Sequence, residues 1–72
     1  MTVRIYPDAK GEKSNAILRF FRKYKITCEL MRPEDMNVAR TYRLGELAAV
    51  EVNGQLFVNP NDDALRKIVD MN

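Results

Sequence analysis

Apolar side chains recur at helical spacing in the first third of the chain. Ile17, Phe20, Phe21 and Tyr24 stand at positions i, i+3, i+4 and i+7, which predicts one buried face of a helix that begins at Ser14. The Ser14 hydroxyl suits the N-cap, where it would accept a hydrogen bond from a free backbone amide. The basic residues between these positions project from the opposite side, and those near the end suit the negative end of the helix dipole.

Two short segments flank this helix. Residues 2–6 alternate in polarity and stop at Pro7, whose ring removes an amide donor, so they predict a strand. Residues 26–31 predict a second strand, in which Cys28 and Leu30 share one face. Because a whole helix separates the two strands, they are most simply parallel and joined by a right-handed crossover, which makes a βαβ unit.

A second and weaker helical pattern covers residues 33–44. Pro33 suits a first helical turn, Glu34 and Asp35 suit the positive end of a helix dipole, and Gly45 suits the C-cap. The apolar face of this segment is weak.

A hairpin and a last helix complete the pattern. Residues 47–52 and 55–58 read as strands, and the dipeptide Asn-Gly between them suits a type I′ turn, in which both central positions take positive φ. Residues 59–62 (Asn-Pro-Asn-Asp) then supply a cap, a first-turn proline and a carboxylate matched to the dipole. The predicted order is β-α-β-α-β-β-α. The apolar stripe of the last helix consists of Ala64, Leu65, Ile68 and Val69.

Length and composition fit one small globular domain over residues 1–72. A chain of 72 residues buries only about 60% of its unfolded surface, so its core is small. A hydrophobic fraction of 46% with a net charge of +2 is ordinary for a folded soluble protein. No apolar run approaches the roughly 20 residues that span a bilayer, and the N-terminus lacks the apolar stretch of a signal peptide. We therefore expect a cytoplasmic protein with no membrane partner.

The chain has one cysteine, Cys28, and no histidine. These counts exclude an internal disulfide, the common zinc sites and histidine-dependent catalytic triads, so we expect no metal and no cofactor. In the middle of a strand, Cys28 is most simply a small buried hydrophobe with an inert thiol. A redox role would need an exposed thiol with a depressed pKa.

Three segments carry a resemblance to a known family. They are the strand over residues 3–6, the helix over residues 15–26 with its pair of phenylalanines, and the stretch 48–57, where a strand ends in Asn-Gly and its return strand leads into the last helix. In this order and at this length they resemble the minimal thioredoxin fold, in particular its glutaredoxin-like branch. The resemblance implies an α/β fold with a four-stranded mixed sheet, the first and last helices on one face and the middle helix on the other.

The features that carry the family's chemistry are missing. Glutaredoxins and thioredoxins place a nucleophilic cysteine, usually as Cys-x-x-Cys, between the first strand and the first helix, whereas residues 6–14 contain no sulfur. The cis-proline that the family has before its third strand is replaced by Ala48 or Ala49. The unactivated hydroxyl of Ser14 cannot substitute for a thiolate. The resemblance thus implies the fold without a catalytic residue, and we expect no enzyme.

The exposed side of the first helix is basic. Arg19, Arg22 and Lys23 lie on it, and Lys10 and Lys13 extend it from the preceding loop. Such a face is ordinary for a solvated helix, but it can also dock an acidic protein or phosphates.

These observations lead to one main hypothesis and two alternatives. We expect a redox-inactive thioredoxin-like module that acts by binding another protein, in the manner of a small regulatory or inhibitory protein of the phage type. The first alternative is a nucleic-acid-binding accessory protein that uses the basic first helix. The second is a monothiol redox protein that uses Cys28, which thiol-disulfide exchange would reveal.

Overall fold

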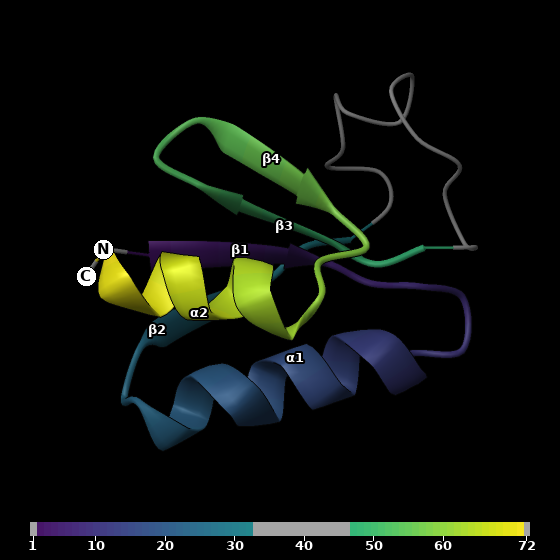
Figure 1. Ribbon diagram of the computed structural model, residues 1–72. Coiled ribbons are helices and arrows are strands. Elements are labelled where there is room, and N and C mark those ends of the chain that lie inside the picture. The colour runs from purple at the N-terminus through teal and green to yellow at the C-terminus, as the bar shows by residue number, and fades with distance from the viewer. Residues whose placement is uncertain (1, 33–46, 72) are drawn as a thin grey trace.

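The computed structural model describes residues 2–32 and 47–71, and the helix predicted over residues 33–44 lies outside them (Figure 1). The described elements alternate strands and helices before ending in a hairpin and a helix. In chain order they are β1 (Thr2–Tyr6), α1 (Glu12–Lys23), β2 (Thr27–Leu30), β3 (Ala49–Val52), β4 (Gln55–Val58) and α2 (Asp62–Asp70).

The four strands form one mixed sheet in the order β2-β1-β3-β4. β1 and β2 are parallel, with Val3 opposite Cys28, which confirms the pairing predicted for strands that a helix separates. β3 runs antiparallel to both β1 and β4. The protein therefore has a mixed α/β fold that is compatible with a thioredoxin-like fold.

The β3–β4 hairpin turns at Asn53 and Gly54. Their φ angles are 51° and 80°, and the register pairs Val52 with Gln55 across a two-residue loop. Positive φ at both positions is what a type I′ turn requires, and glycine and asparagine reach this region at the lowest cost. The predicted hairpin is confirmed.

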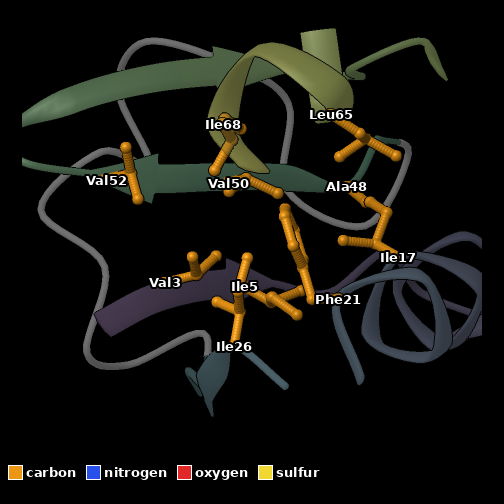
Figure 2. Close-up of a cluster of buried hydrophobic side chains, with 10 residues drawn as sticks. All are labelled: Val3, Ile5, Ile17, Phe21, Ile26, Ala48, Val50, Val52, Leu65 and Ile68. Atoms are coloured by element: carbon orange, nitrogen blue, oxygen red, sulfur yellow. The ribbon is translucent and has the colours of Figure 1, made fainter. Parts of the chain in front are cut away.

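The core lies between one face of the sheet and the two helices. Alternate residues of a strand point to opposite faces, so Val3 and Ile5 of β1 and Val50 and Val52 of β3 point the same way. Figure 2 shows the apolar side chains of α1 and α2 meeting over this face. The buried cluster consists of Val3, Ile5, Ile17, Phe21, Ile26, Ala48, Val50, Val52, Leu65 and Ile68.

A smaller apolar cluster lies on the other face of the sheet. Tyr6 and Ala49 are buried there, with Met31 and Leu56 packed against them. The same face carries the ion pair between Arg4 and Glu51, whose Nη1 and Oε1 atoms are 3.2 Å apart. Because the Arg4 side chain is half exposed, this pair adds at most about 1 kcal/mol to stability.

α1 ends earlier than the hydrophobic spacing predicts. The N–H of Lys25 donates to the carbonyl of Arg22 at 3.1 Å, and the N–H of Ile26 donates to the carbonyl of Phe21 at 3.2 Å, which is a Schellman motif. Lys25 takes the left-handed φ of 57° that this motif needs. Tyr24 is therefore the C-cap and is 41% exposed, so its predicted place in the core is wrong.

α2 begins at a different cap from the one predicted. The Oδ1 atom of Asn61 accepts a hydrogen bond from the N–H of Ala64 at 2.9 Å, which makes Asn61 the N-cap. Asn59 belongs to the hairpin instead, because its N–H donates to the carbonyl of Ala48 at 2.7 Å and its φ is 49°. Pro60 therefore precedes the helix and is not part of its first turn. The stripe predicted for this helix is confirmed, with Leu65 and Ile68 fully buried and Ala64 and Val69 half-buried.

Phe21 is the largest fully buried side chain among the described residues, so its truncation tests the core. We expect Phe21→Ala to lower the free energy of unfolding by about 3–5 kcal/mol, because it leaves a cavity between the sheet and both helices. This loss is a large part of the roughly 5–15 kcal/mol that holds a small domain together, so the variant should be largely unfolded by circular dichroism. Phe20→Ala should cost less and Tyr24→Ala least. An unchanged melting curve for Phe21→Ala would contradict the packing.

Candidate partner-binding surface

The loop before α1 is held by the side chain of Asp8. Its two carboxylate oxygens accept hydrogen bonds from the N–H groups of Lys13 and Ser14, each at 3.2 Å. Gly11 is the N-cap with φ 73°, which turns the chain so that the carboxylate reaches these amides. The prediction that Ser14 is the N-cap is wrong. Ser14 lies inside the helix and is buried, and its Oγ donates to the Gly11 carbonyl at 3.1 Å.

The hydrogen bonds of Asp8 limit what the N-terminal end of α1 can bind. Free amides at a helix start favour an anion, and redox proteins of the thioredoxin type use them to stabilise a thiolate. Here the Asp8 carboxylate already accepts from two of these amides. Partial desolvation acts to raise the pKa of Asp8, but the backbone N–H groups of Ser14 and Lys13 outweigh it, so this pKa lies below its usual value.

The expected surface residues of α1 and its loop are all exposed. Arg19 and Lys23 are four residues apart and project from neighbouring positions on the helix. Arg22 lies about 160° around the helix from Phe20, and its charge acts on Cys28 at the opposite flank. Lys10 stays in the loop. Arg22 is three residues from Arg19, so these two cations are also neighbours on the helix surface. Of the five cations, Lys13, Arg19 and Lys23 line the hollow region described next, whereas Arg22 and Lys10 do not.

Lys13 lines a hollow between α1 and α2, and Arg19 and Lys23 line a shallower depression that adjoins it on α1; we call the two together the α1–α2 groove. Its deeper part has a volume of about 340 Å³. A shallower part continues along α1 and is lined by Ala16, Arg19, Phe20 and Lys23, so Ala16 and Phe20 line both parts. The residues of the deeper part are Lys13, Ala16, Ile17, Phe20, Pro60, Asn61, Asp62 and Leu65.

Phe20 forms part of the apolar lining of this groove. Hydrophobic spacing predicts it in the core, but it is only half-buried, and Phe21 alone of the pair is fully buried. Its ring meets that of Phe21 edge to face, with centroids 5.6 Å apart, and that of Tyr24 at a tilt, with centroids 5.3 Å apart. Aromatic contacts of this kind hold a ring in place, so Phe20 presents a fixed apolar surface.

The two walls of the groove differ in charge. Asp62 stands in the first turn of α2 and lines the deeper part, opposite Lys13. No carboxylate lines the shallower part, where Arg19 and Lys23 lie. Within residues 2–32 and 47–71, none of these three cations forms an ion pair. The groove therefore offers two unpaired cations beside an apolar surface at its shallow end.

Cys28 lies away from this groove. Its side chain is half-buried against the core and not fully buried as predicted. Its Sγ donates to the carbonyl of Ile26 at 3.6 Å. Burial raises the pKa of the thiol, and the charge of Arg22 lowers it by less. At neutral pH the thiol is protonated, which makes it a poor nucleophile.

Two further properties concern only the described part of the chain. None of its helices has the length and apolar character needed to cross a membrane. Its cysteine and carboxylate side chains form no group of three or more that could hold a metal ion.

Sequence reasoning found the cations of this surface but not the groove. The wall from α2 was missed because Asn61, Asp62 and Leu65 are distant from α1 in the sequence. One local signal was available, since Ala16 and Phe20 stand at i and i+4, on the edge of the buried face. Comparisons of the chain with family models, with curated proteins and with solved structures find no match.

Proposed function

We propose that this protein is a redox-inactive, thioredoxin-like binding module that acts on another protein through the surface of α1, as a small regulatory or inhibitory protein. One observation carries the proposal. The α1–α2 groove combines a fixed, half-buried aromatic ring with the exposed and unpaired cations Arg19 and Lys23. Protein interfaces combine an apolar centre with a charged rim in this way, and the rim charges speed association.

The thioredoxin-like part of the proposal is supported by the arrangement of the elements. A parallel β1–α1–β2 unit is followed by an antiparallel hairpin, and α1 and α2 lie on the same face of the sheet (Figures 1 and 2). The redox-inactive part is supported by the loop before α1. That loop has no thiol, and the Asp8 carboxylate accepts from the amides that would stabilise one.

The redox-inactive assignment predicts no disulfide reductase activity. We expect no turnover of a glutathione mixed disulfide above the background without protein, because the only thiol of the chain is half-buried with a raised pKa. Cys28→Ser is the control. Turnover that this substitution abolishes would identify a working monothiol and contradict the assignment.

The binding assignment predicts that charge reversal separates binding from folding. Proteins captured by the immobilised chain from a lysate of its native host should be lost with Arg19→Glu combined with Lys23→Glu. Exposed substitutions usually change stability by no more than about 0.5 kcal/mol, so circular dichroism and melting temperature should stay close to those of the wild type. The matched control is Arg66→Glu combined with Lys67→Glu, which makes the same charge change on α2 and should keep binding.

Nucleic-acid binding is the outcome that would replace this proposal. Contacts to phosphates alone give affinity that falls steeply with salt and ignores sequence. Strong, salt-sensitive binding of a single-stranded oligonucleotide, lost in the α1 variant and kept in the α2 control, would assign the surface to nucleic acid.

The hydrogen bonds of Asp8 in the loop before α1 lead to a separate prediction about stability. We expect Asp8→Ala to lower the free energy of unfolding by about 1 kcal/mol at neutral pH, because two amides of α1 lose their acceptor. Asp8→Asn keeps an acceptor and should lose less. Since folding lowers the pKa of Asp8, the carboxylate stabilises the fold above its unfolded pKa of about 3.9, and this stabilisation is lost as pH falls through the folded value.

Urea denaturation of the wild type and Asp8→Ala across a pH series checks this sign. The difference in unfolding free energy between the two proteins should be constant near neutrality and shrink below about pH 4. A difference that grows on acidification would contradict the role of Asp8 as an ionised cap.

A further inference from the structure

We infer that the α1–α2 groove binds an acidic peptide segment of the partner, with one bulky apolar side chain in its deeper part and carboxylates on Arg19 and Lys23. This inference rests on the proposed function and goes beyond it, because it states which chemistry the partner must carry and how the segment lies.

The deeper part of the groove suits an apolar anchor. Its volume of about 340 Å³ is at the low end of the range for ligand pockets and has room for one large side chain. Ala16 and Phe20 of α1, Leu65 of α2 and Pro60 just before α2 supply its apolar lining. Anchors that fill such pockets carry most of the binding energy at protein interfaces.

The charges around the groove set the position of the partner's carboxylates. Arg19 and Lys23 are four residues apart, about 6 Å along the helix axis, so adjacent acidic groups of one segment can meet both. At the deeper end Asp62 lies opposite Lys13 and disfavours a third carboxylate. The acidic part of the segment therefore lies toward the C-terminal end of α1, with the anchor on the side of the N-terminal end.

The same charges disfavour a polyanion. Asp62 lines the deeper part of the groove, and Glu12 and Asp63 are exposed in the first turns of α1 and α2. A nucleic acid carries a phosphate at every nucleotide and would bring some of them against these carboxylates. A peptide has only a few carboxylates, and all of them can lie next to the cations.

Peptide selection with variants of the groove tests the inference. A library of short random peptides is selected on the immobilised full chain, and the affinities of enriched peptides are then measured by fluorescence anisotropy. Ala16→Arg and Ala16→Gln fill the groove from an exposed position, the first with an added charge and the second without. Arg19→Glu combined with Lys23→Glu removes the cations, and Arg66→Glu combined with Lys67→Glu is the matched control on α2, because neither residue lines the groove.

We expect the enriched peptides to share one bulky apolar residue close to aspartate or glutamate. Both Ala16 variants and the Arg19 and Lys23 double variant should bind them about tenfold more weakly or worse, and the Arg66 and Lys67 double variant should stay within about twofold of the wild type. Circular dichroism checks that each variant is folded. If Ala16→Arg does not fold, the affinity of the neutral variant Ala16→Gln alone tests whether the peptide occupies the groove.

The remaining outcomes overturn the inference in distinguishable ways. No enrichment, or peptides without an acidic and apolar pair, rejects the groove as a peptide site while capture from the lysate still tests the proposed function. If the Ala16 variants bind normally and only charge reversal abolishes binding, the groove is rejected as the binding site, and the cations Arg19 and Lys23 remain as the binding surface. Binding that survives reversal of Arg19 and Lys23, in both peptide and lysate experiments, rejects the proposed function as well. Tighter oligonucleotide binding by Ala16→Arg, without peptide binding, assigns the surface to nucleic acid.

Discussion

The burial of Phe21 fixes how α1 lies on the sheet. Its ring is fully buried between the sheet and α2, and its carbonyl accepts the Ile26 N–H that ends the helix. With Ile17 one turn earlier, it sets the rotation of α1 about its axis. Phe20 then lies about 100° away, at the edge of the buried face, and Arg19 and Lys23 lie beyond it. The composition of the α1–α2 groove follows from that rotation.

Local sequence patterns predicted the elements whose causes are local. The two-residue turn at Asn53 and Gly54 needs only residues that tolerate positive φ, and the stripe of α2 needs only the helical period. The helix ends were predicted less well because their hydrogen-bond partners lie outside the helical pattern. Asp8 reaches α1 across the turn at Gly11, and Asn59 is held by Ala48 just before β3, which leaves Asn61 to cap α2.

The candidate surface depends on contacts between distant segments, and for that reason only half of it could be predicted. Charge along α1 identifies the cations, because exposed positions follow from the helical period. Which of these cations can share one binding site depends on the elements that lie on either side of α1. α2 lies beside Lys13 and Ala16, and Cys28 of β2 lies beside Arg22. Neither neighbour can be derived without knowing that α1 and α2 share a face of the sheet.

The start of α1 illustrates how one local interaction bears on the proposed function. Amides at a helix N-terminus are satisfied by whichever anion is nearest, and an internal carboxylate competes with any external anion or thiolate for them. With Asp8 in that position, the end of the helix stabilises the fold and has less to offer a ligand. On the proposed function, recognition therefore moves from the end of α1 to its flank, where Arg19 and Lys23 are without partners among the described residues. On that proposal, the stability of the helix start depends on Asp8 in the preceding loop, and the binding surface depends on other residues, which lie on the helix itself.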